Sequence, residues 1–348
     1  TINYRFKNKI TLAKNTTPGP LELQSLLARM LKAGVDYCAM EASSHALDQK
    51  RTEGIDFSSA IFTNLTQDHL DYHKTLGSYF RAKAILFRDI RPGAFVVVNN
   101  DDKYGKMLKK LTAARVITYG IKNKSDIMAR DIKFDTRHTE FTLVGPEGRM
   151  NFRSWLIGRY NVYNILAAIA WARQEGIPLA VIRGAVSEFT SVPGRLERIE
   201  SPVAFSVFVD YAHTEDALKN IISTLRQIAQ RKIITVFGCG GERDKGKRPK
   251  MGEVATELSD YAIITNDNPR SEDPRAIISD IKKGIRKKDF CVIYDRLEAI
   301  KKALSLAKQR DIILIAGKGH EDYQVLKNKR IYFDDRKAVR ECLQSMKY

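Results

Sequence analysis

The sequence predicts two consecutive α/β domains, and three observations support this. Short apolar runs such as Phe95–Val98 and Ile312–Ala316 alternate with segments whose apolar residues recur at helical spacing. These runs are far shorter than the roughly 20 residues that a membrane helix needs. The 348 residues suffice for two cores at about 150 residues per domain. Ser191–Gly194 is the best linker candidate, so we expect domains at 1–194 and 195–348.

The first half predicts a mostly parallel sheet with a small antiparallel part. Gly145–Gly148 is typical of a tight turn, so the strands around it should be antiparallel. Expected helices cover 20–33, 78–88 and 160–175, and another begins near Pro178. Expected strands cover 37–41, 59–64, 95–99, 115–119, 127–133, 140–144 and 150–154.

The second half alternates strand and helix more regularly. Thr214 is the expected N-cap of one helix, and Pro274 lies early in another. Strands that are apolar on both faces indicate a parallel sheet covered by helices on both sides. Expected strands cover 204–210, 232–237, 261–265, 290–294 and 312–316.

The amino-acid composition limits the classes of function that the protein can have. The chain has 59 Lys and Arg against 41 Asp and Glu, a formal charge of +18. This balance fits nucleic acid or small polyanionic substrates, but the cations are dispersed and no zinc-finger or RNP-like pattern accompanies them. Four cysteines without a CxxC pair disfavour a disulfide framework and structural zinc. Because Thr1–Ile10 lacks an apolar leader, we expect a cytoplasmic protein.

Charged, glycine-rich loops follow three strands of the second half, at 238–247, 267–270 and 317–322. Ligands of open parallel sheets bind beyond the carboxyl ends of the strands, so we expect these loops to converge on one site. A fourth strand end carries Asp210 and His213. For this pair, contacts to phosphate or ribose and a simple capping network both remain open.

Two strand ends of the first half combine carboxylate and imidazole groups. Glu41 leads into Ser43–His45, and the loop Thr66–His73 follows another strand. Such groups suit a hard divalent cation such as Mg²⁺. Lys83 lies in the middle of a helix, and composition alone gives it no special status.

Together these motifs resemble the Mur ligase family, the ATP-dependent amide-forming enzymes of peptidoglycan synthesis. The resemblance implies a central P-loop-type ATPase domain at 1–194 and a Rossmann-like domain at 195–348 that binds the incoming amino acid. The matching motifs run in family order over essentially the whole chain: Asn15–Thr17, Met40–His45, Thr63–His73, Gly158–Asn164, Gly194–Glu197, Val209–Thr214, Gly238–Pro249, Asp267–Arg270 and Ala316–Gln324.

The resemblance also implies roles by position. Glu41, His69 and a carbamylated Lys83 match the catalytic Mg²⁺ site, where carbamylation turns a cation into an anionic oxygen ligand. The residues implied to hold the UDP-muramoyl-dipeptide are Asn15, Thr16, Thr17, Ser43, Gln49 and Arg51. Those implied to meet ATP are Asn164, Arg195 and Asp210. Those implied for the incoming amino acid are Arg243, Asp267, Asn268, Pro269, Arg270, Gly317 and Glu321.

The implied reaction adds meso-diaminopimelate to the D-glutamate of UDP-MurNAc-L-Ala-D-Glu through an acyl phosphate. Arg270 matters most for the choice of amino acid, because a guanidinium grips the second carboxylate of diaminopimelate with two hydrogen bonds. Lysine-adding relatives lack this arginine. The implied partners are both substrates and ATP; we expect no nucleic acid, no membrane and a monomer.

One departure from the family pattern concerns the phosphate loop. The family's loop is GTNGKT, and no GxxGK[ST] motif occurs in this chain. We therefore expect a C-terminal fragment that lacks the phosphate loop and the uridine-binding domain, and that does not turn over alone. Three alternatives stay open: a catalytically dead remnant, a basic nucleic-acid-binding protein and a folylpolyglutamate synthase-like ligase. The Asp267–Arg270 motif argues against the last.

Overall fold

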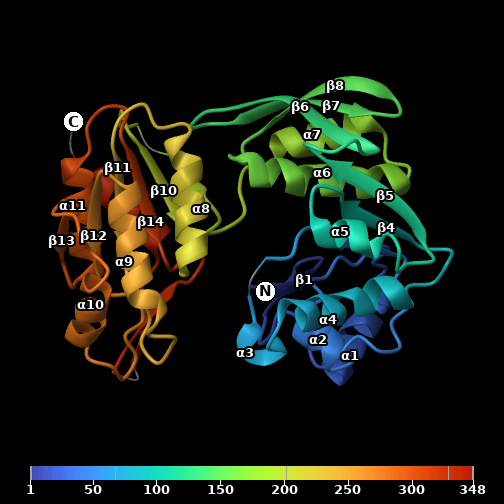
Figure 1. Ribbon diagram of the computed structural model, residues 1–348, viewed down its shortest axis with the longest axis horizontal. Coiled ribbons are helices and arrows are strands. Elements are labelled where there is room, and N and C mark those ends of the chain that lie inside the picture. The colour runs from blue at the N-terminus through green and yellow to red at the C-terminus, as the bar shows by residue number, and fades with distance from the viewer. Residues whose placement is uncertain (1, 67, 201, 328, 347–348) are drawn as a thin grey trace. The chain divides into compact units, whose positions relative to one another are not determined.

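The computed structural model describes residues 2–66, 68–200, 202–327 and 329–346. They form two compact units, both of α/β type (Figure 1). One comprises 1–131, 141–152 and 160–185, and the other comprises 132–140, 153–159 and 186–348. Within the described ranges, no helix has the length and apolarity required to cross a bilayer.

The first unit contains most of the residues of a sheet of order β3-β4-β5-β6-β7-β8. Strands β3 to β6 pair in parallel. Strands β7 and β8 are neighbours joined only by 146–147, a connection that permits only antiparallel pairing, as predicted. The strands are β3 (Ser59–Phe62), β4 (Phe95–Asn99), β5 (Arg115–Gly120), β6 (Ile127–Phe134), β7 (Thr139–Gly145) and β8 (Gly148–Ser154).

Helices and one hairpin complete this part of the chain. Helix α4 (Leu76–Asp89) begins at Thr75, whose side chain accepts a hydrogen bond from the backbone of Ser78. Its buried Phe80 and Phe87 join an apolar cluster with Val96 and Val98 of β4. The other elements are β1 (Asn3–Phe6), β2 (Lys9–Leu12), α1 (Pro20–Lys32), α2 (Ser44–Asp48), α3 (Leu70–His73), α5 (Lys103–Leu108), α6 (Arg159–Gln174) and α7 (Leu179–Glu188).

The strand predicted at 37–41 is wrong. This segment has no regular secondary structure, and no described strand pairs with it. An isolated extended segment cannot satisfy its backbone groups through a sheet ladder, so apolar character alone does not make it a strand. Tyr37 accordingly remains 64% exposed.

The second unit contains a sheet of order β13-β12-β11-β14-β10-β9, parallel except for the edge strand β9. Within β10, Phe208 packs in one apolar cluster whereas Val207 and Val209 pack in another, as the alternation of a strand requires. The strands are β9 (Glu197–Ile199), β10 (Ser206–Asp210), β11 (Ile233–Phe237), β12 (Tyr261–Ile264), β13 (Phe290–Val292) and β14 (Ile312–Ala316). The predicted buried parallel sheet is therefore confirmed.

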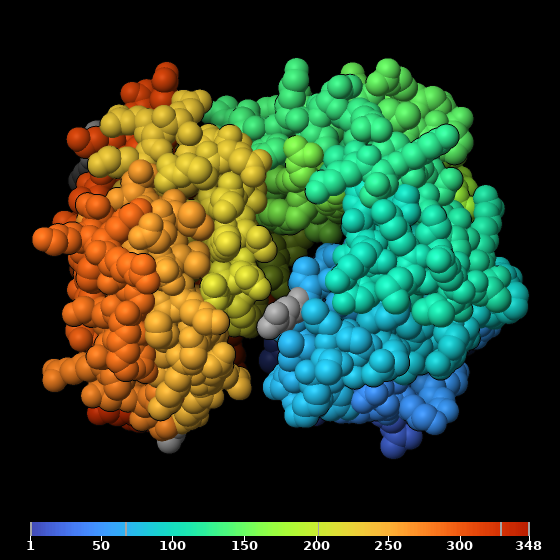
Figure 2. All heavy atoms as spheres, viewed as in Figure 1, coloured from blue at the N-terminus to red at the C-terminus, as the bar shows by residue number. Residues whose placement is uncertain are grey.

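Helices cover both faces of this sheet. Thr214 caps α8 (Glu215–Arg226), and Pro274 occupies the first turn of α10 (Pro274–Lys282), both as predicted. Helices α8 and α9 (Lys247–Leu258) lie side by side on one face and form part of the surface seen in Figure 2. The remaining elements are α11 (Arg296–Leu306), α12 (Asp335–Ser345) and the hairpin β15 (Tyr323–Leu326) and β16 (Lys329–Tyr332).

Candidate active site

Three of the loops at strand ends in the second unit converge. Strands β12, β11 and β14 are neighbours in the sheet, so the loops at their carboxyl ends are neighbours too. The backbone N–H of Gly241 donates to the carbonyl of Asn268 over 2.9 Å. The amide Nδ2 of Asn268 donates to Glu321 Oε2, also over 2.9 Å. The predicted convergence of these loops is confirmed.

Lys318 lies at the centre of this loop cluster, and sequence reasoning did not single it out. Its side chain has no exposed surface, and its Nζ donates to Asn268 Oδ1 over 3.2 Å and to Glu321 Oε2 over 3.1 Å. Asn268 Oδ1 also accepts from the backbone of Val325 over 3.0 Å. In the sequence, only its position in the 317–322 loop points to Lys318. The burial of its ammonium group depends on the folded structure and cannot be read from the sequence.

Arg270 is held by its backbone as well as its side chain. Its N–H donates to the carbonyl of Val325 and its carbonyl accepts from Lys327, both over 2.9 Å. Its guanidinium Nη1 donates to the carbonyl of Gly241 over 2.5 Å. The carbonyl of Pro269 faces Gly241 so closely that a side chain there would collide with it. Arg243, in the same loop as Gly241, is exposed.

Asp267 carries a buried oxygen atom with no hydrogen-bond partner in the described part of the chain. The residue is 8% exposed, and the unpartnered atom is Oδ2. This oxygen faces Gly317, where an added Cβ would lie 2.7 Å from it. A buried carboxylate oxygen left without a donor is costly, so this atom fits an amino group or another donor of a bound ligand.

The fourth strand end combines a buried acid with an aromatic cluster. Asp210 accepts hydrogen bonds from the backbone of Leu196 and of Ala212, both over 2.7 Å. Burial raises the pKa of Asp210, although these amides oppose the shift. The guanidinium carbon of Arg195 lies 5.3 Å from the centre of the Tyr211 ring. Asp210 thus has the capping contacts that the sequence left as one alternative.

His213 and His320 also contact Tyr211, with ring centres 4.6 Å and 5.0 Å from its ring. The structure therefore groups Arg195 and Asp210 around one strand end. Asn164, the third residue predicted to meet ATP, lies on α6 in the first unit, where it is exposed and donates to Asn161 over 3.3 Å.

Thr17 is the centre of a hydrogen-bond network in the first unit. Its hydroxyl donates to the carbonyl of Glu41 over 2.7 Å and accepts from the backbone of Ser43 over 3.0 Å. Arg51 donates to the carbonyl of Thr17 over 3.2 Å and to Gln49 Oε1 over 2.9 Å. Four of the six residues predicted to hold the UDP-linked substrate are therefore together, while the exposed Asn15 and half-buried Thr16 directly precede them.

His69 and Lys83 both lie beside the Tyr79 ring, and the Glu41 carboxylate is near enough to Lys83 to act on its pKa. Lys83 Nζ lies 5.3 Å from the centre of the Tyr79 ring, and the His69 ring centre lies 5.8 Å from it. Burial lowers the pKa of Lys83, whereas the nearby carboxylates of Asp68 and Glu41 act to raise it. Gln67 of the same motif is outside the described residues.

Glu41, His69 and Lys83 differ in their suitability as Mg²⁺ ligands. No group of three or more His, Cys, Asp or Glu side chains within the described ranges is arranged to hold a metal. Glu41 and His69 supply only two such groups, and an unmodified ammonium group on Lys83 would repel a cation. In donor chemistry alone, the three residues would suit Mg²⁺ if Lys83 carried an anionic carbamate, because they would then offer two anionic oxygen donors and an imidazole.

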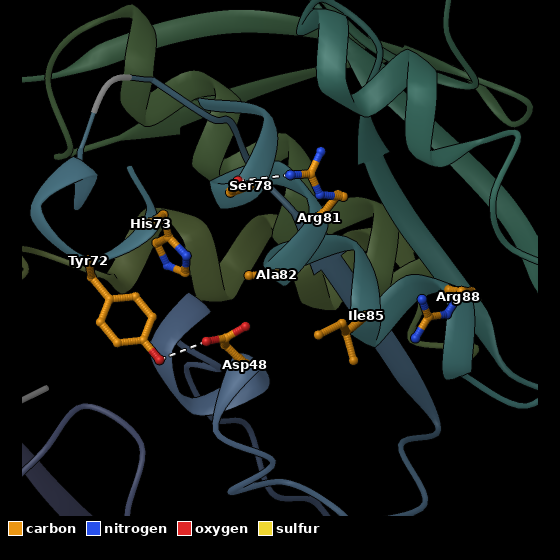
Figure 3. Close-up of a pocket in the computed structure, with 8 residues that line it drawn as sticks. All are labelled: Asp48, Tyr72, His73, Ser78, Arg81, Ala82, Ile85 and Arg88. Atoms are coloured by element: carbon orange, nitrogen blue, oxygen red, sulfur yellow. Dashed lines mark hydrogen bonds between the residues drawn. The ribbon is translucent and has the colours of Figure 1, made fainter. Parts of the chain in front are cut away.

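A cavity of about 460 Å³ lies beside α4, α2 and α3 (Figure 3). Two of its lining residues, Tyr72 and His73, belong to the predicted 66–73 loop, but none is among the residues given a role by the resemblance. Tyr72 donates to Asp48 over 2.7 Å and Arg81 donates to Ser78 over 2.8 Å across its wall. The lining residues are Asp48, Tyr72, His73, Ser78, Arg81, Ala82, Ile85 and Arg88.

Two models of known protein families match most of the chain. The family model described as Mur ligase middle domain matches residues 1–172, and that described as Mur ligase, glutamate ligase domain matches residues 194–319. A UDP-N-acetylmuramoyl-L-alanyl-D-glutamate–2,6-diaminopimelate ligase of Clostridium botulinum is 45% identical over 99% of this chain, which spans 71% of that relative.

Solved structures agree with this result. A UDP-N-acetylmuramoyl-L-alanyl-D-glutamate–2,6-diaminopimelate ligase matches 99% of this chain and 72% of its own length, with TM-score 0.71 and 36% identity. A Mycobacterium tuberculosis folylpolyglutamate synthase in complex with ADP and AMPPCP matches 77% of this chain and 62% of its own length, with TM-score 0.61 and 21% identity. At that identity, the second likeness is one of fold alone.

Proposed function

The chain belongs to the Mur ligase family, and from this premise we propose that it is an ATP-dependent ligase of peptidoglycan synthesis. Its reaction joins meso-2,6-diaminopimelate to the D-glutamate of UDP-MurNAc-L-Ala-D-Glu. The observation that carries the proposal is the convergence of Asn268, Arg270 and Glu321 in one loop cluster, in a chain 45% identical to a ligase named for this reaction. Strongly anionic substrates also account for the charge of +18.

The chemistry follows from the low reactivity of a carboxylate toward an amine. An oxygen of the D-glutamate carboxylate attacks the γ-phosphorus of ATP, and ADP leaves. The free amine of diaminopimelate then attacks the carbonyl carbon of the acyl phosphate. The C–O bond breaks, inorganic phosphate leaves with the electron pair, and the nitrogen loses a proton as the amide forms. Cationic side chains offset the charge that gathers on the transferring phosphoryl group.

Glu41, His69 and Lys83 would hold the Mg²⁺ ion, with Lys83 as a carbamate. Bound Mg²⁺ would neutralise charge on the phosphate oxygens. Burial of Lys83 supports the modification, because a lowered pKa increases the neutral amine fraction that reacts with carbon dioxide. The nearby carboxylates of Asp68 and Glu41 would stabilise the ammonium form of Lys83 before carbamylation.

The loop cluster would bind the incoming amino acid through opposite charges. The guanidinium groups of Arg270 and Arg243 suit its carboxylates, and the carboxylates of Glu321 and Asp267 suit its amino groups. The unpartnered Oδ2 of Asp267 supports this assignment. The other proposed residues of this site are Asn268, Pro269 and Gly317.

Two further groups of residues would bind the UDP-linked dipeptide and ATP. The Thr17 network, with Asn15, Thr16, Ser43, Gln49 and Arg51, would hold the UDP-linked dipeptide, and Asn164, Arg195 and Asp210 would meet ATP. We assign the ATPase domain to 1–194 and the amino-acid-binding domain to 195–348. We infer a monomer in the cytoplasm, where ATP and the nucleotide-linked substrate are available. Because it has no GxxGK[ST] motif, this chain alone is not expected to turn over.

Calorimetric titration of the 348-residue chain with meso-diaminopimelate and with L-lysine tests the proposal. We expect meso-diaminopimelate to bind at least about tenfold more tightly, because L-lysine lacks the second carboxylate. The Arg270→Ala variant should lose this preference, whereas Arg275→Ala, which changes an exposed arginine on α10, should keep it. Equal affinity of the unaltered chain for both amino acids would overturn the proposed substrate.

A further inference from the structure

Lys318 is a charged residue that the proposed reaction does not itself use. Its side chain has no exposed surface, so it cannot reach a substrate from its present position. Removing an ammonium group from water is costly, and only well-placed hydrogen-bond and charge partners offset that cost. Lys318 has such partners in Asn268 Oδ1, at 3.2 Å, and Glu321 Oε2, at 3.1 Å. Both partners belong to the proposed amino-acid site.

We propose that Lys318 is a positioning residue that determines which oxygen of Glu321 meets the amino group of the incoming amino acid. This inference rests on the proposed function of the loop cluster. Oε2 accepts from Lys318 and from Asn268 Nδ2, the latter over 2.9 Å. In the described part of the chain, Oε1 has only the hydroxyl of Tyr323 within hydrogen-bond distance, at 3.5 Å. Oε1 is therefore the oxygen available to a ligand.

Lys318 also orients the amide of Asn268. Because Asn268 Oδ1 accepts from Lys318 Nζ and from the backbone of Val325, the amide Nδ2 must point toward Glu321. Removal of the ammonium group would take a donor from both the amide and the carboxylate. Glu321 could then rotate about its terminal bonds, and its alignment with a ligand amino group would be lost. The contact of Arg270 with a ligand carboxylate would not depend on Lys318.

This dependence distinguishes a positioning role from a merely structural one. A structural defect would lower the affinity of the loop cluster for every ligand. A defect in the alignment of Glu321 would lower the affinity for ligands that carry an amino group and would not change the affinity for ligands that carry only carboxylates. Pimelate provides the comparison, since it retains both carboxylates of diaminopimelate and lacks both amino groups.

The experiment is calorimetric titration with meso-diaminopimelate and with pimelate of four forms of the intact chain. These are the unaltered chain, Lys318→Met, Glu321→Gln and the double variant. We expect Lys318→Met to weaken meso-diaminopimelate about tenfold or more, with less than about a twofold change for pimelate. In the Glu321→Gln background, Lys318→Met should change affinity by less than about twofold, because the two residues act as one unit. Lys282→Met, at an exposed lysine of α10, is the matched control and should leave both affinities unchanged.

The outcomes separate the two proposals. An unaltered chain that binds neither ligand contradicts the proposed amino-acid site itself. Two outcomes contradict only the positioning role. One is that Lys318→Met lowers the affinity for both ligands equally, and the other is that it lowers the affinity further in the Glu321→Gln background. If Lys318→Met does not fold, the double variant tests whether Lys318 positions Glu321. It removes the charges of both Lys318 and Glu321, so neither residue leaves a buried charge without its partner. Its affinity for meso-diaminopimelate must then equal that of Glu321→Gln alone.

Discussion

Arg296 and Asp335 form a fully buried ion pair in which two N–H groups of the guanidinium each donate to one carboxylate oxygen over 2.7 Å. The same guanidinium donates to the carbonyl of Asn266 over 3.3 Å and to that of Ala316 over 3.0 Å. These carbonyls directly precede Asp267 and Gly317 in the chain. The ion pair therefore anchors the start of two loops of the proposed amino-acid site.

Loss of one partner of this pair should strongly destabilise the second unit. Asp335→Asn takes the paired carboxylate away from the buried Arg296 guanidinium, and we expect a loss of about 3–5 kcal/mol in the free energy of unfolding. Urea unfolding monitored by circular dichroism measures it. Lys301→Ala, which breaks an exposed pair with Glu298, is the matched control and should change stability by less than about 1 kcal/mol. Equal effects of the two substitutions would refute this account.

The sequence predicted the parts of the site that depend on local pattern. Neighbouring parallel strands place the loops at their carboxyl ends side by side. Asn268 and Glu321, from two of these loops, are joined by a hydrogen bond. The sequence did not reveal Lys318 or Arg296, because their importance comes from burial among groups distant in the chain. The strand predicted at 37–41 failed for a related reason: its residues favour a strand, but pairing is a property of the whole sheet.

Gly241 should be essential to the arrangement of the loop cluster. An alanine side chain there would collide with the carbonyl of Pro269, which is backbone and cannot turn aside. We expect Gly241→Ala to shift the Asp267–Arg270 loop and to weaken meso-diaminopimelate binding about tenfold or more by calorimetry. Gly93→Ala changes a glycine with open space around it and should preserve the affinity. Unchanged binding in Gly241→Ala would show that the loop tolerates displacement.

Lys83 should be the site of carbamylation. Incubation with ¹³C-bicarbonate is expected to give a carbamate signal in the ¹³C NMR spectrum, because burial lowers the pKa of this lysine and favours its reactive neutral form. Lys83→Arg should lose the signal, whereas Lys106→Arg, at an exposed lysine of α5, should retain it. A signal that survives in Lys83→Arg would assign the modification to another residue and remove the third ligand from the proposed metal site.

Asp101 should make the stability of the first unit depend on pH. Burial acts to raise its pKa, but hydrogen bonds from the backbone of Lys122, Asn123 and Ile121 and from the Tyr163 hydroxyl outweigh it, so the pKa is lowered. A carboxyl with a lower pKa in the folded state contributes stability above its unfolded pKa of about 3.9. That contribution is lost as the pH falls through the folded pKa.

The Asp101→Asn variant should show this dependence directly. At pH 7 we expect it to lower the free energy of unfolding by roughly 1–3 kcal/mol, because an amide replaces a charged acceptor of several backbone N–H groups. The difference from the unaltered chain should shrink once the pH falls below the unfolded pKa of about 3.9, because the unfolded carboxyl takes up a proton before the native one does. Urea unfolding between pH 7 and pH 3 gives the measurement. Asp56→Asn, at an exposed carboxylate paired with Arg91 over 3.3 Å, should show little effect across the same range. A constant difference for Asp101→Asn at every pH would indicate that its hydrogen bonds do not depend on its charge.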